Sequence, residues 1–295
     1  TFDNVPVKAI QARYGFAPDG AWLKRLQLAT VRFPGGTGAF VSGDGLVVTN
    51  HHVGRGYISQ VSTAAADRAR DGFTAADRAA EIPVTGLEIS ILVSMEDVTA
   101  QVHAAVPSGA SAPEALKARR TAHASLRAAQ EAASGLSCET VTLYQGGEYW
   151  VYRYRKFKDV RLVAAPEDQV ANFGGDPDNY TYPRWNLDFT LFRVYENGQP
   201  FRPEAFLPFA STPLKAGDLT FIAGNPGTTF RQQTHAQMLY AHDTGLPFQL
   251  AWLGRQRQAL EAYARTSPEA ARLAADALYG NGNYAKRATG QLLGL

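Results

Sequence analysis

The fold of this chain is decided by residues 35–53, GGTGAFVSGDGLVVTNHHV. Apolar residues recur on both sides of a Gly-Asp-Gly turn, a pattern typical of two short strands joined as a hairpin. The second strand leads directly into a pair of histidines, His51 and His52. A histidine at the end of a strand is held rigidly, and its ring can face a neighbouring cleft. The stretch therefore predicts a catalytic base.

The composition is that of an ordinary globular protein. The 295 residues are 45% hydrophobic and 19% charged, enough for one or two domains with a sizeable core. The net charge of +2 gives no reason to expect nucleic acid or a membrane surface as partner. No run of about 18 apolar residues predicts a membrane span. Cys138 is the only cysteine, which excludes an internal disulfide.

Residues 1–231 are predicted to form a mainly β domain with added helices. Alternating apolar residues predict the strands, and an Ala-, Arg- and Glu-rich stretch without glycine predicts one long helix at 112–133. Residues 1–30 and 64–70 also favour helix, and residues 173–186 read as a loop rich in Gly, Pro and Asp. Besides the hairpin of residues 31–53, the predicted strands are 87–95, 139–145, 150–157, 160–165, 189–195 and 219–223.

Residues 232–295 are predicted to begin a helical domain. From Met238 onward the sequence reads as helix, with breaks expected at Pro247, at Ser267-Pro268 and at residues 280–282. The chain ends in an apolar, helix-like run at residues 291–295, which favours a truncated protein.

Serine peptidase chemistry needs a histidine base and a carboxylate that holds its ring in one tautomer. We interpret His52 as the base, with His51 as its competitor, because adjacent residues of an extended segment point to opposite sides. Asp188 precedes the alternating strand 189–195 and is the predicted orienting carboxylate. Asp176 and Asp178 are alternatives, but both lie in a Gly/Pro loop, where Asp commonly caps a turn.

The nucleophile is missing from these residues. No serine has the Gly-[Asn/Asp]-Ser-Gly context of a serine peptidase nucleophile. Ser42, Ser108 and Ser134 precede a glycine, but Ser42 belongs to the histidine's own hairpin and the other two lie beside predicted helices. The oxyanion hole, whose donors usually come from the serine loop, is therefore also expected outside the chain.

Four blocks resemble the dipeptidyl-peptidase 7 / dipeptidyl-peptidase 11 family of bacterial serine exopeptidases. They are the histidine hairpin, FKDVRLVAAP at 157–166, FGGDPDNYTYPR at 173–184 and DFTLFR at 188–193. The resemblance implies an incomplete chymotrypsin-like double β-barrel followed by the start of an inserted helical domain. It also implies a serine dipeptidyl aminopeptidase with His52 and Asp188 as catalytic residues and its serine beyond this chain.

The resemblance implies further roles at the substrate's free α-amino group. Asn179 and the aromatic residue after it, Tyr180, are expected to bind this group, as is Asn283 in its Asn-Tyr-x-Lys context. The family usually has Trp where Tyr180 stands. An ammonium group needs acceptors, and asparagine carbonyls supply them without adding a charge. Structural alternatives are a turn residue for Asn179 and a helix cap for Asn283.

Two other functions remain open from the sequence: a chymotrypsin-like endoprotease and a non-catalytic peptide-binding module. In each case the expected partner is a peptide, and the favoured function requires a peptide with a free N-terminus. A homodimer is also considered. The histidines lack ligand spacing and no phosphate-binding glycine loop is present, so we expect no metal and no organic cofactor. The family resemblance implies a periplasmic, cell-surface or secreted location. The 295-residue chain alone is predicted to be inactive.

Overall fold

The computed structural model describes residues 2–225, 227 and 233–295. The chain divides into two compact units, each assembled from three segments. Unit 1 comprises Thr1–Val48, Thr85–Arg161 and Phe192–Asn225, and unit 2 comprises Thr49–Val84, Leu162–Leu191 and Pro226–Leu295. The predicted domain boundary at residue 231 lies outside the described residues and stays a prediction.

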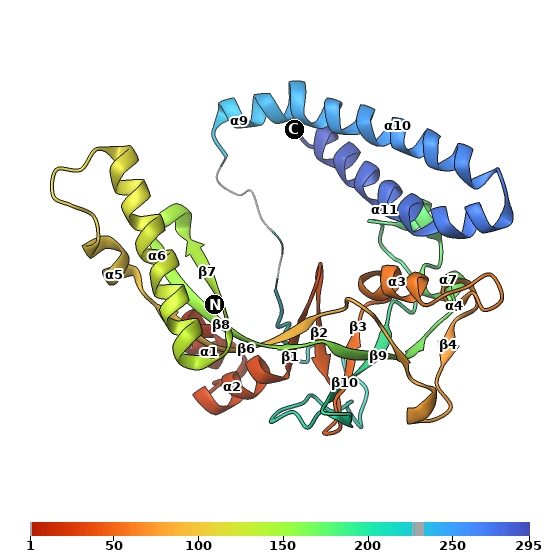
Figure 1. The fold of residues 1–295 in the computed structure, drawn as a ribbon, viewed down its shortest axis with the longest axis horizontal. Helices are drawn as coiled ribbons and strands as arrows, with labels where there is room; N and C mark the ends of the chain where they lie inside the picture. The colour runs from red at the N-terminus through yellow and green to blue at the C-terminus, as the bar shows by residue number, and fades with distance from the viewer. Residues whose placement is uncertain (1, 226, 228–232) are drawn as a thin grey trace. The chain divides into compact units, whose positions relative to one another are not determined.

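Unit 1 is built on a mainly antiparallel sheet with the strand order β10-β3-β2-β1-β6-β8-β7 (Figure 1). The mainly β fold with added helices is thereby confirmed. The described strands form an open sheet, so the closed double barrel stays a prediction. The strands that lie mainly in unit 1 are β1 (Thr30–Phe33), β2 (Gly36–Phe40), β3 (Leu46–Thr49), β6 (Ile89–Asp97), β7 (Ser137–Leu143), β8 (Glu148–Phe157), β10 (Thr190–Glu196) and β11 (Gln199–Pro200). Strand β9 (Asp159–Ala165) begins in unit 1 and ends in unit 2.

The predicted hairpin of residues 35–53 is present as β2 and β3, and β1 extends it by one strand. Alternate residues of these strands are fully buried, as expected for a sheet with one face on the core. Glycine is needed at position 38 of β2, because a Cβ there would lie 2.5 Å from the carbonyl oxygen of Val48 in the neighbouring strand β3. The chain also turns tightly between β10 and β11, with Asn197 and Gly198 at positive φ.

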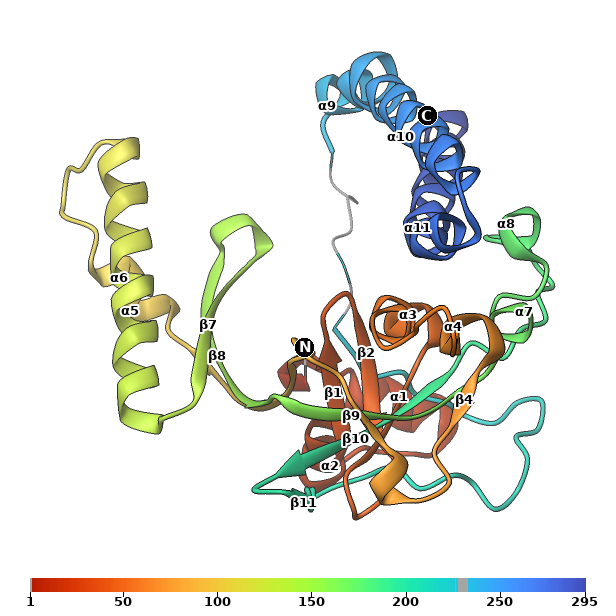
Figure 2. The ribbon, with the colours of Figure 1, turned by 45° about the vertical axis from the view of Figure 1, so that its right-hand side comes forward.

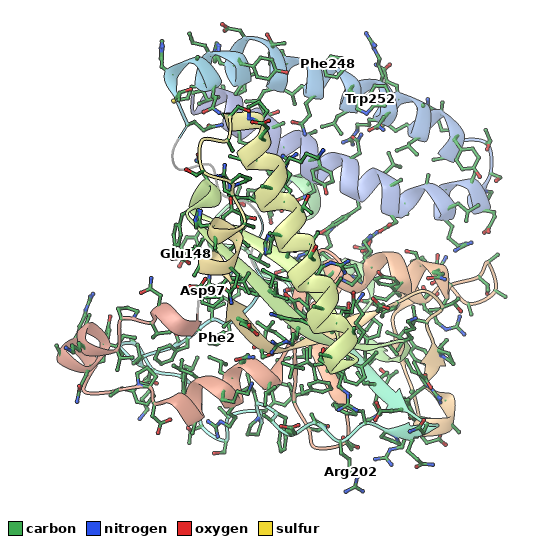
Figure 3. All side chains as sticks on the ribbon, turned by 60° about the vertical axis from the view of Figure 1, so that its left-hand side comes forward. Phe2, Asp97, Glu148, Arg202, Phe248 and Trp252 are labelled. Carbon is green, nitrogen blue, oxygen red and sulfur yellow. The ribbon has the colours of Figure 1, made fainter. Side chains whose placement is uncertain are left out.

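A helical layer covers the hairpin of β7 and β8 (Figure 2). The predicted helix 112–133 is confirmed as α6 (Ala112–Ser134), which packs with α5 (Thr99–Ala104). Its one buried residue, His123, donates a hydrogen bond from Nε2 to the carbonyl oxygen of Trp150 at 2.8 Å. Figure 3 marks with Asp97 and Glu148 where β6 ends and β8 begins. The remaining helices of unit 1 are α1 (Val7–Tyr14) and α2 (Gly20–Ala29).

Unit 2 is mainly helical, and its two longest helices, α10 and α11, lie side by side (Figures 1 and 2). Phe248 and Trp252 project from α10 (Figure 3) and are exposed. None of the described helices combines the length and apolar character that a membrane span requires. The elements of unit 2 are α3 (His51–Gln60), α4 (Arg68–Asp71), β4 (Phe73–Thr74), β5 (Ile82–Pro83), α7 (Asp168–Ala171), α8 (Gly175–Asp178), α9 (His235–Tyr240), α10 (Leu246–Ala264) and α11 (Pro268–Leu293).

Several expectations about secondary structure are wrong. Helix α3 was missed because Gly54 and Gly56 lower the helical propensity of its sequence. Residues 219–223 are irregular rather than a strand, and of the predicted helix 64–70 only the end is helical, in α4. Pro247 breaks no helix, because helical structure runs from α9 through a wider turn at Ala241–Gly245 into α10.

Helix α11 also continues through residues 280–282, where a break was expected. Its start is as predicted, since the side chain of Ser267 accepts a hydrogen bond from the N–H of Ala270 at 3.0 Å. The glycine at 282 has a packing reason, because a Cβ there would lie 2.3 Å from Oδ2 of Asp176. At Gly280 a Cβ would meet nothing within 4 Å.

These two glycines provide a matched test. Gly280→Ala should stabilise the protein by up to about 1 kcal/mol, because alanine has the higher helical propensity. Gly282→Ala should be less stable than Gly280→Ala, because Asp176 must leave its place against α11. Urea unfolding of both variants measures the difference, and equal stabilisation by the two substitutions would show that the contact with Asp176 is unimportant.

Candidate active site

Asp188 and His52 meet at the N-terminus of α3. Nδ1 of His52 lies 2.6 Å from Oδ2 of Asp188, and the backbone N–H of His52 donates to Oδ1 of the same carboxylate at 3.0 Å. Asn50, just before the helix, donates from Nδ2 to Oδ2 of Asp188 at 3.2 Å. One carboxylate thus binds the imidazole with one oxygen and caps the helix with the other. Its negative charge is also favourable at this end of a helix.

The environment of Asp188 keeps it ionised. Burial alone would raise the pKa of Asp188, but the hydrogen bonds from the ring and backbone of His52, and the charges of His52 and His51, outweigh burial and lower it. The side chain is 23% exposed. A carboxylate that stays charged favours the proton on Nδ1 of His52, which leaves the lone pair of Nε2 available as a base.

The two adjacent histidines have different environments. The side chain of His52 is 49% exposed, whereas His51 is 2% exposed and its Nε2 has no hydrogen-bond partner among the described residues. Burial and then the charge of Arg55 lower the pKa of His51, although Asp168 and Asp188 act in the opposite direction. The two histidines do separate, but not as alternate residues of a strand, because both lie in the first turn of α3.

The buried His51 leads to a prediction about acid stability. Its folded pKa is below the ordinary value of 6.5, so the unfolded chain takes up a proton more readily as the pH falls. The free energy of unfolding should therefore decline as the pH drops below 6.5, until the folded pKa is passed. In His51→Gln this part of the decline should be absent. Denaturant titrations between pH 7.5 and pH 4.5 measure it, and parallel pH profiles would contradict the prediction.

The alternative carboxylates point elsewhere within unit 2. Asp176 lies against Gly282 of α11 and 3.7 Å from Nη1 of Arg257 on α10. Asp178 folds over Gly174, where it would collide with any Cβ. Neither is among the groups that hydrogen-bond His52. Asp188 is therefore the carboxylate that the structure brings to the predicted base.

A second polar cluster joins the loop of residues 173–186 to α11. Asn179 donates from Nδ2 to Oδ1 of Asn283 at 2.9 Å. Nη1 of Arg184 donates to Oδ1 of Asn179 at 2.9 Å, and its Nη2 donates to Oδ1 of Asn172 at 2.7 Å. A guanidinium only donates, so Arg184 fixes which end of the Asn179 amide is oxygen. Each of the two predicted amide oxygens, on Asn179 and Asn283, keeps one lone pair for a further donor.

Tyr180 follows Asn179 in an unusual backbone conformation. Its φ is 61°, in the left-handed region that large side chains rarely adopt. The side chain is 59% exposed. Such a conformation persists only where surrounding contacts hold it, and it is found preferentially at ligand sites. On α11, Lys286 secures the same loop by donating from Nζ to the carbonyl oxygens of Asp176 and Pro177 at 2.6 and 2.7 Å.

The serines of unit 2 are not placed as nucleophiles. Ser62 donates to the carbonyl oxygen of Ile58, and Ser267 caps α11. Ser59 lies seven positions after His52 on α3, about 10 Å further along the helix. In unit 1, Ser42 is engaged with Asp44 in its own hairpin turn. Among the described residues, no group of three or more His, Cys, Asp or Glu side chains is arranged to hold a metal ion.

Sequence reasoning missed Arg55, a buried residue on the same helix as the two histidines. Its side chain is 7% exposed and pairs with Asp168, while its Nε lies 3.4 Å from Oδ1 of Asp276. Its guanidinium also lies over the ring of Tyr279, 4.6 Å from the centroid. The signal in the sequence was an arginine four residues after His51 on an unrecognised helix.

Comparisons with known proteins place the chain in a recognised group. The sequence matches the Peptidase S46 family over residues 1–295. Dipeptidyl-peptidase 7 of Porphyromonas endodontalis is 37% identical over 70% of this chain and 27% of its own length. Dipeptidyl-peptidase 7 of Phocaeicola vulgatus is 32% identical over 88% of this chain and 38% of its own length.

Solved structures agree with the sequence matches. DPP11 of Porphyromonas endodontalis in complex with the dipeptide Arg-Glu superimposes with a TM-score of 0.83 and 27% identity, over 97% of this chain and 45% of DPP11. The complex of the same protein with Arg-Asp gives the same TM-score. The chain thus spans less than half the length of the relatives it matches.

Proposed function

Since the chain belongs to peptidase family S46, we propose that it is part of a serine dipeptidyl peptidase that releases dipeptides from the free N-terminus of peptides. The observation that carries the proposal is the 2.6 Å contact between Nδ1 of His52 and Asp188, with the second carboxylate oxygen on the backbone N–H of His52. The names of the relatives, dipeptidyl-peptidase 7 and Asp/Glu-specific dipeptidyl-peptidase, support the reaction class.

In the proposed mechanism His52 acts as general base through Nε2. It takes the proton from the serine hydroxyl as the oxygen attacks the scissile carbonyl, and then gives it to the leaving amine. Asp188 stabilises the imidazolium that forms between these two steps. We propose that the serine and the oxyanion hole are not among these 295 residues, because no serine of the sequence has the required context.

Asn179, Tyr180 and Asn283 are the proposed binding group for the substrate's α-amino end. The free lone pairs on the two asparagine oxygens give an ammonium two acceptors, and the hydrogen bond from Nδ2 of Asn179 to Oδ1 of Asn283 at 2.9 Å keeps the two side chains together. The exposed ring of Tyr180 can add a face for the cation. An anchor at the amino end would limit cleavage to the second peptide bond. The DPP11 complexes with dipeptides are consistent with a product of this size.

We extend the proposal to the fold and location of the whole protein. The open sheet of unit 1 would be part of a chymotrypsin-like double barrel, and the helices from residue 233 onward would begin an inserted helical domain. A periplasmic or cell-surface location and a homodimer remain predictions from the family resemblance.

The catalytic pair can be tested in the complete encoded protein. Asp188→Asn should lower kcat by about four orders of magnitude, because the ring loses its tautomer and its counter-charge. His52→Ala should be comparably inactive, whereas Asp71→Asn, at an exposed carboxylate paired with Arg70, should leave kcat unchanged. Near-normal turnover in Asp188→Asn would contradict the proposed roles. Turnover by the 295-residue chain alone, abolished by His52→Ala, would place the nucleophile within it.

The amino-end anchor predicts a strong preference for unblocked peptides. Peptides with a free amino group should yield dipeptides, and their N-acetylated counterparts should be cleaved far more slowly. Asn179→Ala should raise KM for the free peptides by about tenfold to a hundredfold, the cost of 1–3 kcal/mol for a lost hydrogen bond to a charged group. Product analysis by mass spectrometry measures both effects. Equal cleavage of blocked peptides would favour an endoprotease, and binding without cleavage a non-catalytic module.

A further inference from the structure

One face of α11 contacts both halves of the candidate site. Asp276, Tyr279 and Asn283 are spaced i, i+3 and i+7, so they lie on the same side of the helix. Asp276 and Tyr279 contact Arg55, and Asn283 contacts Asn179. The helix that carries the predicted amino-end anchor is therefore also the helix that packs on α3.

Helix α3 has the complementary arrangement. His52 and Arg55 are three residues apart, and the helix between them is regular. His52 contacts Asp188, and Arg55 contacts Asp168 of α7 together with Asp276 and Tyr279 of α11. Arg55 is thus the point at which three chain segments meet, one turn of helix from the catalytic base.

The contacts of Arg55 depend on its guanidinium. A buried charge is tolerated only where partners compensate it, and Arg55 has two carboxylates on two different segments and an aromatic face. Tyr279 is close enough to the active site for its pKa to respond to it: burial first, and then the charge of Asp188, raise the pKa of Tyr279, while Arg55 and Arg184 lower it. Tyr279 thus contacts Arg55 and lies within electrostatic reach of Asp188.

The distance between base and anchor determines the length of the product. Each residue of an extended peptide adds about 3.5 Å to its length. An enzyme that releases dipeptides must therefore hold the group that binds the amino end at a fixed distance from its catalytic base. In unit 2, Arg55 links α3, which carries the base, to α11, which carries Asn283 of the anchor.

We propose that Arg55 is a positioning residue that fixes the length of the released peptide, by holding the anchor helix α11 at a set distance from His52. This inference rests on the proposed function. Arg55 touches neither substrate nor reacting atoms in this role, and it acts through Asp276 and Tyr279 on Asn283.

The test uses the complete encoded protein and a ten-residue peptide with a free amino end. Arg55→Met keeps the stem of the side chain but loses the charge. It should lower kcat/KM for dipeptide release by about a hundredfold, the typical effect of a misplacement near 1 Å. The ratio of tripeptide to dipeptide products should rise above that of the wild type, because α11 no longer holds the anchor at the distance of two residues. Arg55→Lys retains a charge for Asp168 but loses the planar guanidinium that contacts Asp276 and Tyr279, so its ratio should lie between those of the wild type and Arg55→Met.

Two further variants separate loss of the contact between Arg55 and α11 from general effects of substitution on folding and activity. Arg70→Met removes an exposed arginine paired with Asp71 in the same unit and should change neither quantity. Asp276→Asn leaves the pair of Arg55 with Asp168 intact and weakens only the contact to α11, so it decides the question if Arg55→Met does not fold. A wild-type product ratio in a folded Arg55→Met, or in Asp276→Asn in its place, would overturn the proposal.

A readout without turnover separates this inference from the proposed function. Hydrogen exchange of residues 276–286 should be faster in Arg55→Met than in the wild type, because α11 loses its contact with α3. If the wild-type protein released no dipeptides, the proposed function would fail. Exchange would still decide whether Arg55 holds α11 on α3, and unchanged protection of residues 276–286 in Arg55→Met would overturn that part of the inference.

Discussion

The site depends on one carboxylate that has two tasks. Asp188 binds Nδ1 of His52 with one oxygen and the backbone N–H of the same residue with the other. Because the second contact satisfies the first turn of α3, the orientation of the imidazole and the start of the helix are determined together. The backbone hydrogen bond keeps the carboxylate in place opposite the ring, so the partner of the base is positioned by the helix start as well as by the ring itself.

Mutual hydrogen bonds also hold the side chains of the amino-end cluster in place. Asn179, Asn283 and Arg184 fix one another's orientation through donors and acceptors that have a single consistent arrangement. Gly282 and Lys286 bring α11 close to the loop that carries Asn179, one by its missing side chain and the other by two hydrogen bonds to backbone carbonyls. A loop rich in Gly, Pro and Asp thereby obtains the rigidity that a binding group needs.

Much of unit 1 could be predicted from the sequence because its strands alternate and its long helix lacks breakers. The helices of unit 2 were harder, since α3 contains Gly54 and Gly56 and α11 contains Gly280 and Gly282. Gly282 reflects a tertiary contact with Asp176, which local propensity does not include. His52 and Asp188 were chosen from their neighbours in sequence, but the helix cap and the role of Arg55 needed coordinates.

The amide oxygens of Asn179 and Asn283 have a consequence for the acidity range in which such a site can work. Amides do not titrate, so the acceptors present the same dipoles in acid and in base. Under the proposed function, the pH dependence of substrate binding at this cluster then follows the protonation of the peptide's α-amino group, whose pKa is about 8. At alkaline pH the α-amino group of the peptide would lose its charge and bind more weakly, while the two asparagine side chains would stay the same.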